Sequence, residues 1–227
     1  NGNTNKESFS ERIRSIAKNN LYGVDINKEA LKVACFSIYI ALLDYQEPKD
    51  INLYRFPNLL NENLFEADFF HVEHQYNEII GRINFDYILG NPPWKKDDSN
   101  HHLEWINNHK IYSKKIKGKI EIAQSFLLRV KDFMTSNTEV ALIVTSTIFY
   151  NVSKTTQEFK YNFLTSFYIR KFFDLSPVRR LIFEEKNSPA SIVYYKLSDG
   201  TNAPNNIINH QSIKPNIFLK LFKMLVV

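Results

Sequence analysis

Short apolar runs alternate with amphipathic stretches along this chain, and the alternation predicts an α/β protein. Helices are expected at residues 6–18, 28 to about 43, 72–80 and 120 to about 134. Strands are expected at residues 21–24, 63–65, 85–89, 140–144, 171–175 and 192–195. Strands alternating with helices indicate an α/β sheet.

Two of these elements have the clearest patterns. Asn27 is a preferred N-cap for the helix that begins at residue 28. The inner stripe of that helix is expected at Ala30, Ala34, Ile38, Ala41 and Leu42. In the helix at 120–134, apolar residues recur every three or four positions, at Ile120, Ala123, Phe126, Leu127, Val130 and Phe133. The strand at 140–144 is apolar throughout, which predicts burial on both faces.

Other stretches lack such periodicity. Residues 95–119 are polar and are expected to form a mobile loop. From Asp199 the composition changes to Gly, Thr, Asn and Pro, which predicts a linker, and residues 218–227 form an amphipathic segment. The length predicts one domain, or one and a half.

The composition excludes several classes of binding site and of protein. The chain has 6 glycines in 227 residues, and no two have the spacing of a Walker loop or a GxGxxG turn. The single Cys35 excludes a disulfide framework or a CxxC zinc site, and it fits a reducing compartment such as the cytoplasm. No apolar run is long enough to span a bilayer. The net charge of +5 permits a polyanionic partner without requiring one.

Polar signals stand at the ends of three predicted strands, where ligands of open α/β sheets bind. Asp25 and Asp68 end two of them, and Asn91-Pro92-Pro93-Trp94 follows the third. The two prolines remove two backbone donors and fix φ, so the Asn91 amide oxygen and the Pro92 carbonyl can point outward as acceptors. This arrangement suits a planar amine, on which Trp94 could stack.

Each signal also has a plain structural interpretation. Asn91 to Trp94 could be a strand-terminating turn followed by a core tryptophan. Asp25 could bind ribose hydroxyls or cap the following helix, and Asp68 could be a solvated loop residue. The glycine turn that partners a ribose-binding Asp lies about 20 residues upstream, which is at or before Asn1.

Several motifs in order resemble the adenine-N6 DNA methyltransferases of type I and bifunctional type II restriction–modification systems. They are residues 21–27 (LYGVDIN) with Glu29-Ala30, 63–69 (NLFEADF), 85–94 (FDYILGNPPW), the helix around Phe126, the strand 140–144, Leu181-Ile182-Phe183 and 188–191 (SPAS). The resemblance covers roughly residues 8–198. It implies a Rossmann-like class I methyltransferase sheet, with an antiparallel strand at 192–195 and without the first strand and glycine loop.

The resemblance also assigns roles. Asp25 would accept from the ribose hydroxyls of S-adenosyl-L-methionine, with Ile26 against its adenine; Asp68 would accept from the adenine amine, and Phe69 and Phe126 would line that pocket. Asn91 and the Pro92 carbonyl would hold the N6 amine of a flipped adenine between Trp94 and Phe183. RNA or protein-glutamine methylation remains an alternative, since other methyltransferases share Asn-Pro-Pro-aromatic. A non-catalytic fragment that binds DNA or a subunit is another.

A lysine-rich stretch follows Asn91-Pro92-Pro93-Trp94. Residues 95–119 contain seven lysines against three acidic residues, a net +4. Lys95, Lys96, Lys114, Lys115 and Lys117 are therefore candidate contacts to the phosphates of double-stranded DNA, although an ordinary solvated loop has the same composition.

Two metal patterns are weak. His71 and His74 lack an evident third ligand, so no metal site is expected. Asp174 with Glu184-Glu185-Lys186 is similar to a nuclease metal motif, but the second part falls in a presumed loop.

Residues 1–198 are expected to form a partial catalytic domain, and residues 199–227 a linker and the start of a target-recognition region. The isolated chain is expected to bind S-adenosylmethionine weakly or not at all.

Overall fold

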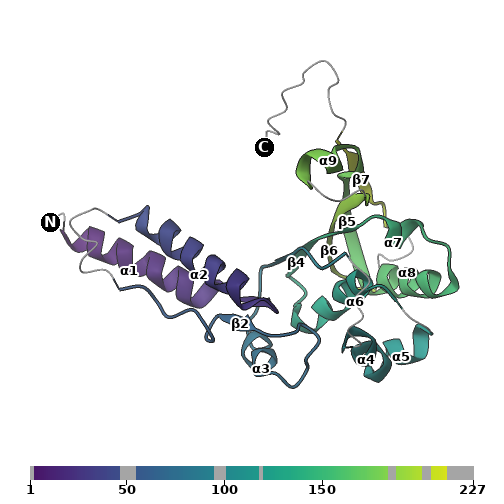
Figure 1. The fold of residues 1–227 in the computed structure, drawn as a ribbon, viewed down its shortest axis with the longest axis horizontal. Coiled ribbons are helices and arrows are strands. Elements are labelled where there is room, and N and C mark those ends of the chain that lie inside the picture. Colours follow the sequence, from purple (N-terminus) through teal and green to yellow (C-terminus); the bar gives the residue numbers. More distant parts are fainter. Residues whose placement is uncertain are drawn as a thin grey trace, which may run out of the picture. The chain divides into compact units, whose positions relative to one another are not determined.

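The computed structural model describes residues 3–46, 55–94, 101–117, 120–183, 188–200 and 206–213. Contacts divide the chain into two compact units, Asn1–Arg82 and Ile83–Val227, whose elements are labelled in Figure 1. Each unit is described by itself. None of the helices in the described ranges is long and apolar enough to cross a membrane.

The first unit combines three helices with a two-stranded parallel sheet. Its elements are α1 (Asn3–Asn20), β1 (Gly23–Asp25), α2 (Lys28–Leu43), β2 (Leu64–Glu66) and α3 (Tyr76–Ile80). Gly23 lies opposite Leu64 and Asp25 opposite Glu66, so both strands end at the same edge. The helix expected at 72–80 begins only at Tyr76.

Helix α2 begins as the sequence predicts. The Asn27 side chain accepts the backbone N–H groups of Glu29 at 2.9 Å and Ala30 at 3.2 Å, which satisfies donors that a helix start leaves unpaired. The bounds of α2 therefore agree with the prediction.

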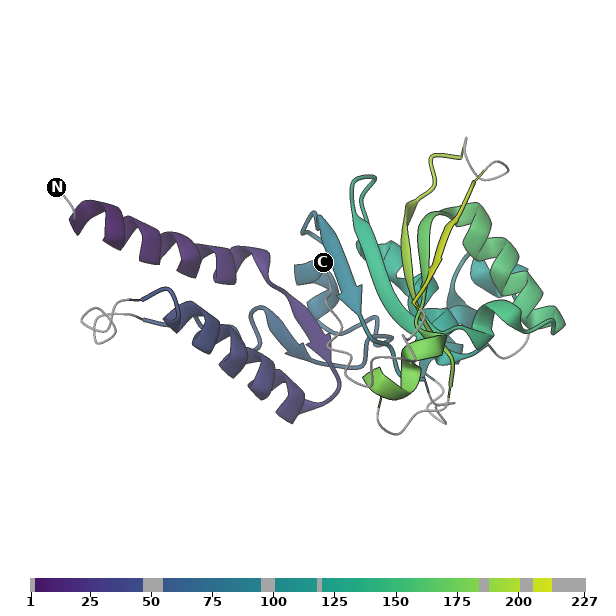
Figure 2. The same ribbon diagram turned by 90° about the horizontal axis from the view of Figure 1, so that it is seen from above.

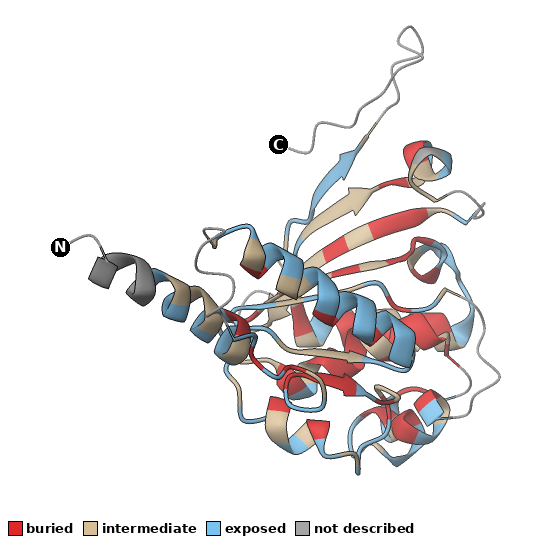
Figure 3. Ribbon diagram, turned by 60° about the vertical axis from the view of Figure 1, so that its left-hand side comes forward, coloured by how far each residue is buried: buried red, intermediate tan, exposed pale blue. Residues whose placement is uncertain are grey.

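The buried face of α2 differs from the predicted stripe. Leu31, Cys35 and Leu42 are buried, and the first two pack with Leu59 and Leu64. Of the predicted positions, only Leu42 is buried and Ile38 half-buried; Ala30, Ala34 and Ala41 are exposed. Because α2 carries apolar residues on most sides, its periodicity did not determine which side the β2 region would cover. Most of α2 is exposed in Figure 3.

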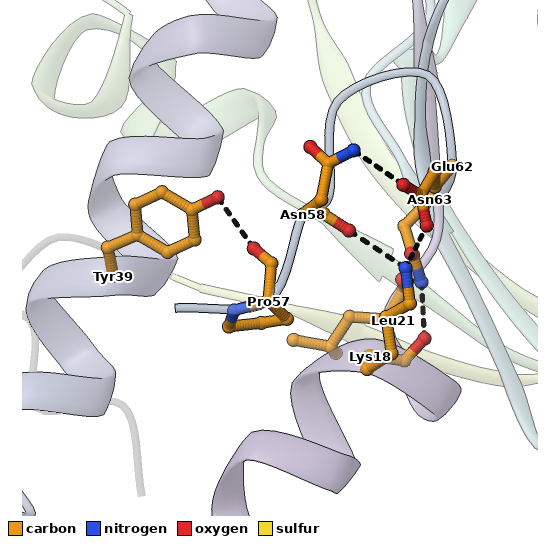
Figure 4. A network of polar contacts seen from close by, with 7 residues as sticks. All are labelled: Lys18, Leu21, Tyr39, Pro57, Asn58, Glu62 and Asn63. Atoms are coloured by element: carbon orange, nitrogen blue, oxygen red, sulfur yellow. Dashed lines mark hydrogen bonds and ion pairs between the residues drawn. The ribbon is translucent and has the colours of Figure 1, made fainter. Parts of the chain in front are cut away.

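Polar contacts fix the loop that leads into β2 (Figure 4). The Lys18 ammonium donates to the Asn58 carbonyl at 2.9 Å and pairs with Glu62. The buried Asn63 donates its side-chain amide to the Lys18 and Leu21 carbonyls, at 2.7 and 2.9 Å. The Tyr39 hydroxyl donates to the Pro57 carbonyl at 2.8 Å. These bonds set the position of β2 against α1 and α2.

The second unit contains a mixed five-stranded sheet in the order β3-β4-β6-β5-β7. Its strands are β3 (Tyr87–Gly90), β4 (Glu139–Thr145), β5 (Phe167–Asp174), β6 (Ala190–Leu197) and β7 (Asn209–Ser212). β3 is parallel to β4, and β7 is parallel to β5. β6 runs antiparallel to both β4 and β5, which confirms the antiparallel strand implied by the resemblance.

Helices α4 (His101–Asn108), α5 (Tyr112–Lys115), α6 (Ile122–Arg129), α7 (Thr147–Tyr150) and α8 (Lys154–Ser166) lie on one face of this sheet (Figure 2). Helix α9 (Arg179–Ile182) packs with Phe173 and Ile192, whose side chains point to the opposite face. There are also 3-10 turns at Val130–Phe133 and Ser176–Val178. In β4, Val140, Leu142 and Val144 are buried, whereas Ala141 and Ile143 are half-buried. The predicted burial of this strand on both faces is therefore wrong.

Three further predictions differ from the structure: a loop, the start of a strand and a linker. The loop expected at 95–119 contains α4 and α5, with Trp105, Ile106 and Tyr112 buried; residues 95–100 and 118–119 lie outside the described residues. β5 begins at Phe167, four residues before the prediction. The presumed linker contains β7, and residues 218–227 lie outside the described part of the chain.

Candidate functional site

Asp25 stands at the end of β1 in the first unit, on the exposed side of its strand. One of its carboxylate oxygens accepts the Asn27 backbone N–H at 2.7 Å. Asn27, and not Asp25, provides the side-chain cap of α2, so capping does not account for Asp25. Its other oxygen accepts no hydrogen bond from the residues that the structure describes. The next residue, Ile26, has 72% of its surface exposed.

Asp68 lies two residues beyond β2, at the same edge as Asp25, because β1 and β2 are parallel and in register. It is half-buried, and one carboxylate oxygen accepts the Phe70 N–H at 2.8 Å. The half-buried Phe69 ring stacks on Tyr76 with 6.5 Å between centroids. The first unit thus brings two carboxylates and two apolar side chains, Ile26 and Phe69, to its strand ends.

In the second unit, Asn91 and Pro92 follow β3. Asn91 is exposed, and Pro92 is buried. Gly90 lies opposite Leu142 of β4, and a Cβ atom on Gly90 would stand 3.0 Å from the Leu142 side chain. A larger residue at position 90 would displace either the Leu142 side chain or the backbone that leads to Asn91. The close approach of the two strands therefore favours glycine directly before Asn91.

Trp94 and Phe183 are brought together although 88 residues separate them. Their rings form an edge-to-face pair with centroids 4.8 Å apart and planes at 66°. The Trp94 indole N–H donates to the Ile143 carbonyl of β4 at 3.4 Å. A flat ring held between them would need a gap of about 7 Å, two van der Waals contacts of ~3.5 Å. The pair must therefore open before it can hold such a ring.

The remaining predicted site residues are placed in part. Phe126 lies half-buried on α6, in the second unit, whereas Phe69 lies in the first. Lys114 and Lys115 are exposed on α5 and Lys117 is exposed just after it; none of their ammonium groups forms an ion pair with the described residues. Lys95 and Lys96 lie outside the described residues.

Lys117 also helps to position α5. Its backbone N–H donates to the Glu158 carboxylate at 2.7 Å, and its carbonyl accepts the Thr155 hydroxyl at 3.3 Å. Both partners are on α8. The lysines are therefore presented from a packed segment.

The histidine pattern does not form a ligand group within the described residues. The His71 and His74 rings lie 5.9 Å apart, but His74 Nδ1 accepts the Tyr76 N–H at 3.2 Å. Within the described ranges no three His, Cys, Asp or Glu side chains gather as metal ligands would. Glu184 and Lys186 lie outside those ranges.

The sequence analysis missed a group of serines beside β4. Ser146 and Ser191 are fully buried, and their hydroxyl oxygens lie 2.5 Å apart. The Ser146 N–H donates to the Pro189 carbonyl at 3.0 Å. The available signal was the pair Thr145-Ser146, polar residues directly after an apolar strand. The group ties the end of β4 to the start of β6.

Comparisons with known proteins identify the family and the fold of the chain. A family model described as Eco57I restriction-modification methylase matches residues 19–181. Among proteins with curated descriptions, none matches the sequence significantly.

Solved structures show the same fold. A nuclease-deletion mutant of the Type ISP restriction-modification enzyme LlaGI, in complex with a DNA substrate mimic, matches with a TM-score of 0.64 and 11% identity, over 92% of this chain and 20% of that chain. A modification subunit of a putative type I restriction enzyme from Vibrio vulnificus YJ016 matches with 0.57 and 11%, over 92% and 38%. A putative class I S-adenosylmethionine-dependent methyltransferase from Listeria monocytogenes matches with 0.52 and 10%, over 86% and 50%.

This chain therefore spans one fifth to one half of the length of these structures. It has the α/β fold of the class I methyltransferases. Because the family model covers most of the chain, including the ends of β1, β2 and β3, the chain belongs to the Eco57I restriction-modification methylase family.

Proposed function

We propose that this chain is the catalytic part of a DNA adenine-N6 methyltransferase of a restriction–modification enzyme. The observation that carries the proposal is the exposed Asn91 directly after β3, with Trp94 of the same motif in contact with Phe183. We call residues 91–94 the Asn91 turn. The family membership and fold support it. We place a partial catalytic domain at residues 1–198, and a linker and the start of a target-recognition region at residues 199–227; β7 of this second stretch pairs with β5 of the catalytic sheet.

Residues of the first unit fit S-adenosylmethionine. Asp25 has one carboxylate oxygen that no described residue uses, so it can accept from ribose hydroxyls, and the exposed Ile26 offers an apolar surface to the adenine ring. Asp68 would accept from the adenine amine, with Phe69 lining that pocket. When bound, this cofactor supplies the electrophilic methyl group.

The Asn91 turn would activate the target base. The exocyclic nitrogen of adenine is a poor nucleophile because its lone pair is delocalised into the ring. If the Asn91 amide oxygen and the Pro92 carbonyl accept hydrogen bonds from its two N–H groups, the nitrogen becomes more tetrahedral and its lone pair is available for in-line attack on the methyl group. The nitrogen–methyl bond would form as the sulfur–methyl bond breaks, and the nitrogen would then lose one proton to solvent. Positioning then supplies much of the rate.

The aromatic pair would hold the flipped base. Extrusion from the duplex costs a few kcal/mol, and stacking returns ~1–3 kcal/mol per base. Trp94 and Phe183 would separate to admit the ring. Lys95, Lys96, Lys114, Lys115 and Lys117 would contact phosphates of double-stranded DNA, so binding should weaken steeply as salt rises. A target-recognition domain or a specificity subunit would be a further partner.

Methyl transfer by the complete enzyme tests this proposal. In Asn91→Ala we expect transfer from labelled S-adenosylmethionine to adenine-containing DNA to fall by ~10²-fold or more, as when a positioned hydrogen-bonding group is lost from a transition state. The exposed Asn107 of α4 gives a matched control, Asn107→Ala, which should retain activity.

The methylated product distinguishes the alternatives. N6-methyladenine in DNA supports the proposal. Full activity of Asn91→Ala, or methyl groups found only on RNA or glutamine amides, would contradict it.

A further inference from the structure

An apolar cluster surrounds Trp94, and one of its members comes from an unexpected part of the chain. Leu175, Val178 and Ala190 are buried at its centre, and Trp94, Phe173, Ile182, Phe183, Ile192 and Ile213 pack against them. Ile213 follows β7, in the segment whose composition predicts a linker. The surroundings of the Trp94–Phe183 pair therefore depend on residues beyond β6.

The pairing of strand β7 with β5 places Ile213 in this cluster. Residues Asn209–Ser212 pair in parallel with Lys171–Asp174 of β5. The His210 ring stacks on Phe172 with centroids 5.5 Å apart and planes at 15°. All four residues of β7 are exposed, so this short edge strand buries little apolar surface of its own. Its placement depends on the contacts at its ends.

Asp174 connects β7 to the segment that carries Phe183. One carboxylate oxygen accepts the Ser176 N–H at 2.9 Å, and the other accepts the Ser212 hydroxyl at 3.5 Å. The Asp174 carbonyl accepts the Ile213 N–H at 3.4 Å. Both carboxylate oxygens are thus used in hydrogen bonds within the fold.

The Ser176 contact sets the path toward Phe183. The turn Ser176–Val178 leads directly into α9, and Phe183 follows that helix. The Arg179 guanidinium donates back to the Ser176 carbonyl at 2.7 Å, and the Phe183 N–H donates to the Arg179 carbonyl at 2.8 Å. A change at Asp174 can therefore reach Phe183 through a short series of hydrogen bonds.

We propose that Asp174 and Ile213 are positioning residues for the Trp94–Phe183 pair, and that β7 holds Phe183 beside Trp94 in the closed arrangement from which the pair separates to admit a flipped base. Neither residue touches the reacting atoms. The inference rests on the proposed function and adds a requirement for the chain beyond β6. It also assigns a role to Asp174, whose nuclease-like pattern the methyltransferase reaction does not use.

The test uses the complete enzyme with two versions of one duplex. One carries 2-aminopurine in place of the target adenine, and its emission reports unstacking. The other keeps the adenine and gives kcat and KM, because 2-aminopurine has no C6 amino group to methylate. In Ile213→Ala we expect a smaller emission change on binding and a fall in kcat of about tenfold, comparable to weakening one aromatic contact. KM for S-adenosylmethionine should not change, because the proposed cofactor carboxylates lie in the first unit. The matched control is Ile207→Ala, since Ile207 lies before β7 and is 88% exposed.

A second pair of variants guards against misfolding. Asp174→Ala should repeat the Ile213→Ala result, and Asp174→Asn should restore much of the emission change, because its amide can replace both side-chain hydrogen bonds. If Ile213→Ala behaves like Ile207→Ala while Asn91→Ala is inactive, the positioning role is wrong and the proposed function stands. If both Ile213→Ala and Asp174→Ala lose cofactor binding and melt early, the cluster is only structural and the inference is overturned.

Discussion

His109 accepts two backbone hydrogen bonds through one ring nitrogen. Its Nδ1 receives the N–H groups of Ile111 at 3.2 Å and Tyr112 at 3.3 Å, and its ring stacks on Tyr112 at 4.3 Å. Burial lowers the pKa of His109 below its usual 6.5; the nearby Asp132 opposes this shift, while Lys131 and Arg129 add to it. The neutral ring therefore joins α4 to α5.

This environment predicts a loss of stability in acid. The pKa of His109 is lower in the folded chain, so the unfolded chain binds the extra proton first as pH falls below 6.5. The free energy of unfolding should be fully maintained above that pH and should decrease down to the folded pKa. Urea titrations at several pH values measure the slope.

The control for this slope is His109→Asn, whose amide oxygen can accept a backbone N–H but does not titrate. It should show a shallower decrease in stability between neutral and mildly acidic pH. Parallel curves for the two proteins would assign the acid sensitivity to other groups.

At the scale of elements, the start of α2 was predicted correctly and its buried face was not. The start of α2 was predicted because Asn27 marks it locally. Its buried face was not, because Leu59 and Leu64 select that face and both are distant in sequence. Helices α4 and α5 of the lysine-rich region were not predicted, because the polar composition of this region does not indicate that Trp105 and Ile106 are buried.

In the candidate site, the positions of single residues were predicted and their long-range contacts were not. The residues at the ends of β1, β2 and β3 were found from sequence, since each directly follows an apolar run. Their partners were not: the contact of Trp94 with Phe183 and the packing of Ile213 join segments separated by long stretches of chain. Such pairings depend on tertiary packing, which local patterns do not specify.

The corrected face of α2 gives a matched pair of substitutions. Leu31 is 6% exposed and packs against Leu59 and Leu64, whereas Val33 on the same helix is 64% exposed. Leu31→Ala should lower the free energy of unfolding by about 2–3 kcal/mol through lost burial and a cavity. Val33→Ala should change it by less than about 0.5 kcal/mol. Chemical denaturation measures both, and equal effects would contradict this assignment.

At the scale of the whole molecule, the sheet of the second unit ends in an open strand. β3 pairs with β4 on one side and with no described strand on the other. Tyr87 and Leu89 of this strand are 72% and 75% exposed. Open apolar edges are templates for further strand pairing.

A polypeptide of this sequence should therefore self-associate through β3. Replacing both residues, Tyr87→Lys with Leu89→Lys, should lower the association seen by sedimentation as concentration rises, because charges on an edge oppose pairing. Val152→Lys places one charge at an exposed position outside the strands and should have little effect. An unchanged association of the double variant would exclude β3 as the contact.

The distribution of two rare residue types gives each unit its own reporter. Cys35 is the only cysteine of the chain and is buried in the first unit, whereas both tryptophans, Trp94 and Trp105, belong to the second. The rate of thiol labelling therefore measures how often the first unit opens, and indole emission follows the second. Without any engineered label, the two readouts distinguish joint from independent unfolding of the units.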